Sequence, residues 1–181
     1  MDKNTILERL KELGERLALD GIEAEMVIFG GAAISLVHDS RRITHDIDVS
    51  CSHKTDVVSK ALQLCQERDL PTDWLNSAGD IFLSDDVPTV DFMDFPGLKL
   101  KVVAADYLLA MKLKSSRIGT NDFSDTKLLI NKLGIRTRGD AESLIRKYFP
   151  AFKQGKNHQK NLEHAFMPLN PANSGKPPGP G

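Results

Sequence analysis

The chain has 181 residues, with 24 basic and 25 acidic side chains and a formal net charge of −1. That length suits a single domain with a tail, and a core of this size needs neither disulfides nor a structural metal. The near-neutral charge excludes a strongly basic nucleic-acid-binding protein, leaving room only for a local basic face. The two cysteines, Cys51 and Cys65, form neither a disulfide framework nor a CxxC pair. No apolar run approaches the roughly 20 residues of a membrane span, so we expect a cytoplasmic protein with no membrane partner.

Hydrophobic periodicity gives a clear order of elements along the chain. The pattern predicts, in turn, a helix over 4–19, a strand over 25–29 that ends at Gly30-Gly31, a short helix over 32–37, a strand over 42–49, a helix over 55–68, a turn-rich segment over 71–86, strands over 89–95 and 98–103, and helices over 105–117, 122–133 and 139–149. A set of strands followed by an all-helical end is typical of the α/β (α+β) class, with a small mixed sheet and a helical C-terminal half.

The same order suggests how the chain is divided. We expect one domain over residues 1–150, with a sheet part at about 1–104 and a helical part at about 105–150. Residues 151–169 would form a helical extension. Residues 170–181 read NPANSGKPPGPG, which is too rich in proline and glycine to bury a core, so we expect a disordered tail.

The strand predicted over 42–49 carries the most informative side chains. Because side chains alternate faces along a strand, Arg42, Thr44, Asp46 and Asp48 are expected on one face, and Ile43, Ile47 and Val49 on the other, core-directed face. Two carboxylates two residues apart repel each other unless a cation lies between them. Oxygen ligands of this kind suit Mg²⁺ (or Mn²⁺), which completes its shell with water and substrate phosphates.

A glycine pair precedes the Asp46-Ile-Asp48 sequence of this strand by about fifteen residues. A strand that ends at Gly30-Gly31 and turns into a helix lets the backbone approach a phosphate without interference from a Cβ atom. Either feature alone is weak, because glycine pairs and DxD sequences also occur at ordinary turns and solvated strand ends. Together they favour a site for phosphoryl or nucleotidyl transfer, where positioning and charge neutralisation supply most of the catalysis.

The combination of GG, a short helix and Arg42-Ile-Thr-His-Asp-Ile-Asp48 resembles the minimal nucleotidyltransferases of the DNA polymerase beta superfamily. More narrowly, it resembles a bacterial group of uncharacterised nucleotidyltransferases allied to AbiEii-type toxins of toxin–antitoxin systems. Three further stretches resemble that group: Asp73-Trp-Leu-Asn76, Leu98-Lys-Leu-Lys-Val-Val103, and Tyr107-Leu-Leu-Ala-Met-Lys-Leu113 followed by Arg117, Asp122 and Asp125.

The resemblance implies a transfer of a nucleoside monophosphate from an NTP to an acceptor hydroxyl, with RNA, tRNA or a protein as acceptor and a cognate antitoxin as partner. It implies metal binding by Asp46 and Asp48. Lys112 would neutralise triphosphate charge, and Asp122 or Asp125 would complete the acidic cluster or act as a base. Phosphate-facing candidates are Gly30, Gly31, Arg42, Thr44 as a supporting hydroxyl, and Arg117.

Several of these residues also have a purely structural interpretation. Asp122 and Asp125 lie at the start of a predicted helix, where acidic residues complement the helix dipole. Trp74 is expected in the core rather than as a stacking platform. Many related enzymes place a third carboxylate on a later strand, for which Asp91 and Asp94 are candidates on opposite faces.

Another function class remains open from the sequence. Asn121 stands where the toxins tend to show arginine. That departure and the absence of an evident third carboxylate support a non-catalytic nucleotide-sensing or protein-interaction module that retains the fold.

Overall fold

A computed structural model describes residues 1–79, 83, 86–115, 121–153 and 155–166. The strands are β1 (Ala24–Phe29), β2 (Ile47–Cys51), β3 (Leu75–Asn76), β4 (Thr89–Phe95) and β5 (Leu98–Val103). The helices are α1 (Lys3–Leu19), α2 (Gly30–Ala33), which continues as the π-helix η1 (Ile34–His38), α3 (Lys54–Arg68), α4 (Ala105–Ser115), α5 (Asn121–Lys132), α6 (Arg138–Tyr148) and α7 (Lys156–Phe166). The α/β class predicted from the sequence is confirmed.

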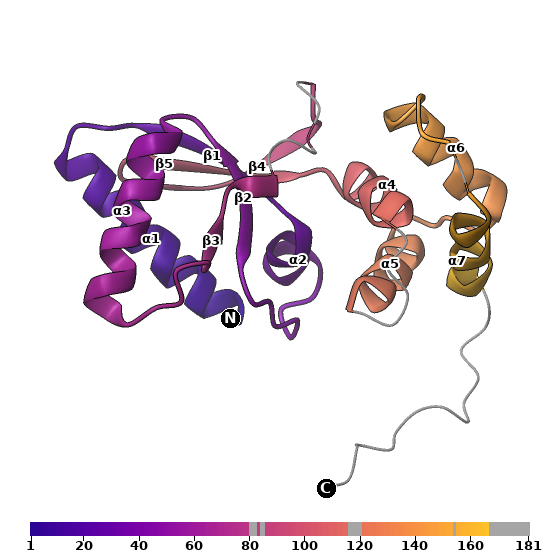
Figure 1. The fold of residues 1–181 in the computed structure, drawn as a ribbon, viewed down its shortest axis with the longest axis horizontal. Coiled ribbons are helices and arrows are strands. Elements are labelled where there is room, and N and C mark those ends of the chain that lie inside the picture. Colours follow the sequence, from indigo (N-terminus) through magenta and orange to yellow (C-terminus); the bar gives the residue numbers. More distant parts are fainter. Residues whose placement is uncertain (80–82, 84–85, 116–120, 154, 167–181) are drawn as a thin grey trace, which may run out of the picture.

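The strands form one five-stranded mixed sheet in the order β3-β2-β1-β5-β4. The central strand β1 pairs antiparallel with β2 and parallel with β5, and β4 and β5 form the predicted hairpin. Helices α1 and α3 pack against each other and against β5 and β2, respectively, whereas α4 to α7 lie together beyond the sheet (Figure 1). The strand residues beneath α1 and α3 are buried; they include Met26, Ile28, Val49, Leu98 and Leu100. The opposite face of the sheet is therefore left to carry polar groups.

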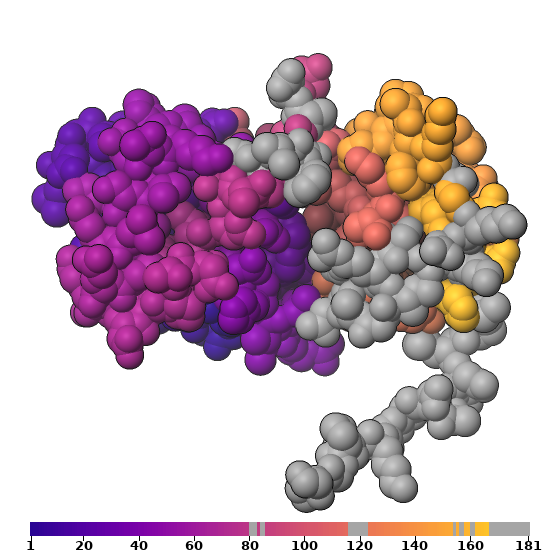
Figure 2. Space-filling view, in the orientation of Figure 1, coloured from indigo at the N-terminus to yellow at the C-terminus, as the bar shows by residue number. Residues whose placement is uncertain are grey.

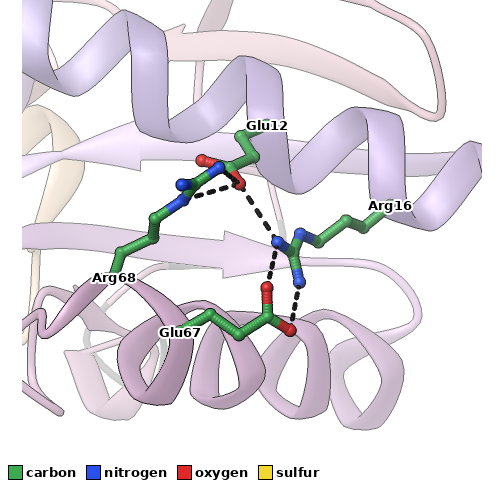
Figure 3. Close-up of polar contacts among 4 residues, drawn as sticks. All are labelled: Glu12, Arg16, Glu67 and Arg68. Atoms are coloured by element: carbon green, nitrogen blue, oxygen red, sulfur yellow. Dashed lines mark hydrogen bonds and ion pairs between the residues drawn. The ribbon is translucent and has the colours of Figure 1, made fainter.

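A surface ion-pair network joins the two helices that cover the sheet (Figure 3). Arg16 on α1 donates to both carboxylate oxygens of Glu67 on α3, at 2.9 and 2.6 Å, and Arg68 donates to Glu12 at 2.9 Å. The Glu67 carboxylate raises the pKa of Arg16, and the Arg68 guanidinium lowers the pKa of Glu12. Exposed pairs of this kind stabilise a fold only modestly, so burial of apolar side chains remains the main contribution from this face.

The segment before β2 differs from its predicted conformation. We expected a strand from residue 42, but β2 begins at Ile47, so that interpretation was wrong for its first half. The reason is that β1 ends at Phe29 opposite Asp48, which leaves residues 42–46 no strand to pair with. Ile43, expected in the core, is consequently 65% exposed.

Local hydrogen bonds hold this irregular segment in place instead of a strand ladder. Ser35 Oγ donates to Arg42 O at 2.8 Å, and Thr44 Oγ1 donates to Asp46 O at 3.1 Å. Such side-chain bonds to backbone compete with regular secondary structure. From Asp46 onward the predicted alternation holds, with Ile47 and Val49 fully buried and the two aspartates only partly so.

The turn-rich segment contains a short strand that the sequence did not indicate. In β3, Leu75 and Asn76 pair in parallel with Ile47 and Asp48. The preceding residue, Trp74, is 1% exposed and donates from Nε1 to Ala61 O on α3 at 3.3 Å. Trp74 is thus a core residue, as expected, and it anchors β3 beside β2.

The helical part is built around α4. Tyr107 packs edge-on against Tyr148 of α6 with ring centroids 5.0 Å apart, and Asp106 accepts hydrogen bonds from Tyr148 and Lys147. Residues 170–181, predicted to be disordered, lie outside the described residues. Within the part of the chain that the structure describes, no helix has the length and apolar character needed to cross a membrane.

Two glycines allow α1 to approach the β4–β5 turn closely, and this contact generates a prediction. An ideal Cβ on Gly14 would lie 2.6 Å from Pro96 O. Gly97 has φ +68°, and an ideal Cβ there would lie 2.5 Å from Gly14 O. We expect Gly14→Ala to lower the free energy of unfolding by about 1–3 kcal/mol, because a backbone clash must be relieved.

The control is Gly139→Ala in α6, where the nearest atom to the new Cβ is 3.7 Å away. We expect that change to be neutral or slightly stabilising, since alanine favours helix. Urea unfolding of both variants measures the difference. Equal midpoints would contradict the close packing of α1 on the turn.

Candidate functional site

A cleft of about 480 Å³ lies where the sheet part meets α4. Figure 2 shows these parts as two neighbouring lobes, the sheet part in indigo to magenta and the helical part in salmon to yellow. The lining residues are Phe29, Gly30, Asp46, Asp48, Asn76, Ala78 and Gly79 from the sheet side, and Leu108, Met111, Lys112 and Ser115 from α4. This volume is in the usual range for sites that bind small molecules.

The sheet wall of the cleft is acidic. Asp46 and Asp48 both line it, as their alternation across the start of β2 predicts. Asn76 on β3 lies beside them, and its Nδ2 is 3.1 Å from Asp48 Oδ1 and 3.4 Å from Asp46 Oδ2. One amide nitrogen therefore contacts both carboxylates.

The glycine pair is required by close contact within this wall. Gly30 has φ +63°, and an ideal Cβ there would lie 2.2 Å from Asp48 Oδ2. An ideal Cβ on Gly31 would lie 2.7 Å from Thr44 Oγ1. Any larger residue at position 30 would displace the Asp48 carboxylate or fill the space beside it. The glycine pair and the segment that ends in Asp48 are thus in close contact, and glycine is required for that contact.

The opposite wall contributes a cation. Leu108, Lys112 and Ser115 all line the cleft, and they lie at i, i+4 and i+7 along α4. Lys112 is buried, with a side chain 7% exposed, and its Nζ lies 3.0 Å from Asp125 Oδ2 on α5. A lysine thus faces the same cleft as the two aspartates.

Asp125 forms the centre of a buried ion cluster rather than part of the cleft wall. Its side chain is 2% exposed, and Arg42 Nε donates to its Oδ1 at 3.0 Å. Arg42, Asp125 and Lys112 thus connect the segment before β2, α5 and α4. Among the described residues, the cleft-lining set includes neither Asp125 nor Arg42.

The remaining candidates lie elsewhere. Arg117 falls outside the described residues, as does the side chain of Asp122 in the first turn of α5. Asp91 and Asp94 lie exposed on the edge strand β4, which β5 and β1 separate from β2, and neither lines the cleft. Thr44 is buried beneath Gly31.

Sequence reasoning missed Asn76, the residue that bridges the two aspartates. In the sequence Asn76 is the last residue of Asp73-Trp-Leu-Asn76, and the available signal is a polar residue directly after tryptophan and leucine. The apolar patch of Leu108, Met111 and Phe29 was also missed, because apolar residues on α4 and β1 are indistinguishable from core residues in sequence.

The donor set suits a hard cation. Asp46 and Asp48 offer carboxylate oxygens on one wall of a cleft that has room for water and phosphate, which is the environment Mg²⁺ prefers. Within the described residues no group of three or more histidine, cysteine, aspartate or glutamate side chains could hold a metal. Two carboxylates fit Mg²⁺ or Mn²⁺, which completes its shell with water and substrate phosphates.

A second contact between α5 and the sheet part involves a histidine. Lys132 Nζ lies 3.0 Å from His38 Nδ1 at the end of η1 and 3.5 Å from Val37 O. Burial, followed by the nearby Lys132 cation, lowers the pKa of His38 below its ordinary value of 6.5. The neutral form of His38 is thus favoured in the folded state.

The buried cluster predicts a large cost for removing its centre. Asp125→Asn removes the carboxylate that pairs with Lys112 and Arg42 in the buried ion cluster. We therefore expect the free energy of unfolding to fall by about 3 kcal/mol. The matched control is Asp73→Asn, because Asp73 is 65% exposed and pairs with the exposed His45; there we expect a change within about 0.5 kcal/mol. Chemical denaturation measures both. A small effect of Asp125→Asn would mean that the cluster does not hold the two parts together.

The lowered pKa of His38 predicts a pH dependence. Above 6.5 the residue is neutral in both states; as pH falls below 6.5, the unfolded chain binds the proton more readily, so stability is lost until the folded pKa is reached. We therefore expect the wild type to lose stability relative to His38→Gln between about pH 7 and pH 5. Urea midpoints across this range test it, and parallel profiles would refute the assignment.

Comparison with known proteins places the chain in a family. None of the curated proteins matches it in sequence. A solved structure described as an antigenic nucleotidyltransferase-like protein from Paracoccidioides brasiliensis is similar with a TM-score of 0.44 and 17% identity, over 86% of this chain and 93% of that one. Residues 5–128 match the family described as Nucleotidyltransferase of unknown function (DUF6036). That match covers β1 to β5, the cleft and the buried ion cluster, and the chain therefore belongs to this family of nucleotidyltransferases.

Proposed function

We propose that this protein transfers a nucleoside monophosphate from an NTP to an acceptor hydroxyl. The observation that carries the proposal is the placement of Asp46 and Asp48 on one wall of a single cleft and of Lys112 on the other. Carboxylates suited to a divalent cation and a lysine suited to phosphate are the charges that a metal-bound triphosphate needs.

The residues of the cleft have separate roles in this proposal. Asp46 and Asp48 would hold Mg²⁺ or Mn²⁺, which, when bound, neutralises the triphosphate and orients it for in-line displacement. Lys112 stabilises the negative charge of the departing pyrophosphate. Gly30 lets the Asp48 carboxylate lie against the backbone of the glycine turn without a clash with a Cβ atom. The acceptor oxygen forms the new bond to the α-phosphorus, the bond to pyrophosphate breaks, and the hydroxyl proton is released.

Two of the predicted roles change in the light of the contacts. Asp125 was expected to complete the acidic cluster or to act as a base, but it is buried between two cations. We infer that it positions Lys112 instead. Arg42, expected to contact phosphate, donates to Asp125 and so supports the same lysine indirectly.

The acceptor is proposed by resemblance to the AbiEii-type toxins. It would be RNA, tRNA or a protein, with a cognate antitoxin as the partner and a bacterial cytoplasm as the setting. The chain as a whole is near neutral, so an RNA acceptor would have to bind through a local basic face.

A non-catalytic nucleotide-sensing or protein-interaction module is the second candidate. The observation that favours it is the distance of Asp91 and Asp94 from β2, since neither supplies a third strand carboxylate to the cleft. Such a module would bind NTP in the presence of metal without turnover.

The experiment that separates these functions is incorporation of label from each α-³²P-NTP with Mg²⁺ into total RNA and into the protein itself. We expect Asp46→Ala and Asp48→Ala to reduce incorporation by at least about a hundredfold, because charge stabilisation of the transition state is lost. The control is Asp91→Ala, an exposed aspartate on β4, which should transfer like the wild type.

Transfer that survives both substitutions in the cleft would show that the metal site is assigned to the wrong residues. NTP binding without label in any acceptor would favour the sensing module. The labelled species, where there is one, identifies the acceptor class.

A further inference from the structure

Asn76 makes more contacts within the cleft than its place in a two-residue strand would suggest. Its Nδ2 lies 3.1 Å from Asp48 Oδ1 and 3.4 Å from Asp46 Oδ2. In register, Asn76 stands directly opposite Asp48 on β2. The amide is thus held beside both carboxylates by the sheet itself.

The orientation of this amide is fixed by its other end. Ala78 N donates to Asn76 Oδ1 at 3.0 Å, so the carbonyl oxygen is turned toward the backbone and the amide nitrogen toward the aspartates. If the amide flipped, Oδ1 would lie against two carboxylates and the Ala78 N–H would face Nδ2. Both contacts would then be repulsive, so the observed orientation is the stable one.

The strand that carries Asn76 is itself firmly anchored. Ile47 N donates to Trp74 O at 2.8 Å, and the Trp74 indole is buried against α3. Asn76 follows Trp74 by two residues, so its position is fixed by core packing rather than by a surface loop. The amide is therefore presented to the aspartates as a preformed donor.

The contacts divide the oxygens of Asp48 between two neighbours. Oδ1 accepts from Asn76, whereas Oδ2 faces the space beside Gly30, where a Cβ would lie 2.2 Å away. Without a donor, the Asp46 and Asp48 carboxylates would repel each other and turn apart. A fixed N–H group between them offsets part of that repulsion and leaves an oxygen of Asp48 directed toward Gly30.

We propose that Asn76 is a positioning residue that holds Asp46 and Asp48 in the arrangement that shares one divalent cation, and that it is not itself a metal ligand. The proposal rests on the metal-binding role of the two aspartates in the proposed function. It assigns to Asn76 the part that outer-shell hydrogen bonds play at metal sites, where their loss weakens metal affinity by about 10–100-fold.

The test is direct binding of Mn²⁺ to the full chain, measured by isothermal titration calorimetry without NTP. Asn76→Leu has nearly the same size and lacks the donor, and Asn76→Ala is a smaller second variant in case leucine perturbs the fold. We expect both to bind Mn²⁺ about 10–100-fold more weakly than the wild type. The control is Ser77→Ala, because the Ser77 contact to Lys54 uses the backbone oxygen; it should bind like the wild type.

A second readout separates positioning from a merely structural defect. In the transfer assay, Asn76→Leu should require more Mn²⁺ for half-maximal rate but approach the wild-type rate at saturation, and its thermal unfolding without metal should match that of Ser77→Ala. Metal affinity of the Asn76 variants equal to or tighter than the wild type would overturn the proposal while leaving the metal site intact. Failure of the wild type itself to bind Mn²⁺ would overturn the metal site and the role of Asn76 together.

Discussion

The buried cluster of Arg42, Asp125 and Lys112 is the constraint on which the cleft depends. Three charged groups from three segments meet where water is largely excluded, with Asp125 2% exposed and Lys112 7% exposed. Such a cluster is costly to bury and more costly to break, because removing one member leaves the others unpaired. It therefore fixes how α4 and α5 meet the sheet part, and it sets the position of Lys112 relative to Asp46 and Asp48.

The cleft places opposite charges on walls of different origin. Its acidic wall is built by β2, β3 and the glycine turn, and close contacts leave Asp48 little freedom between Gly30 and Asn76. Its other wall, among the described residues, presents Lys112, which the helical part holds in place. A triphosphate carrying a divalent cation complements both walls at once, whereas a simple anion or cation complements only one. That pairing is the reason we propose nucleotidyl transfer rather than phosphate or metal binding alone.

Much of the fold followed from local pattern, and the exceptions have physical reasons. The helices with clear periodicity and the strands of the β4–β5 hairpin lie within about two residues of their predicted bounds. The reason is that burial of one face of each element produces the hydrophobic period from which the bounds are predicted. The strand expected over 42–46 is not formed, because β1 ends at Phe29. Where a partner strand ends cannot be predicted from the local sequence pattern. Asp46 and Asp48 could be found from alternation, but the partners of Asp125 and Asn76 could not. Those contacts join residues 83 and 28 positions apart, respectively.

In the proposed function, one cleft binds both the metal and the triphosphate. A crystal structure with Mn²⁺ and a non-hydrolysable NTP, with the anomalous signal of manganese, tests it most directly. We predict a manganese peak between the Asp46 and Asp48 carboxylates and triphosphate oxygens within reach of Lys112. Manganese bound away from these aspartates, or nucleotide bound on another face of the protein, would contradict the account.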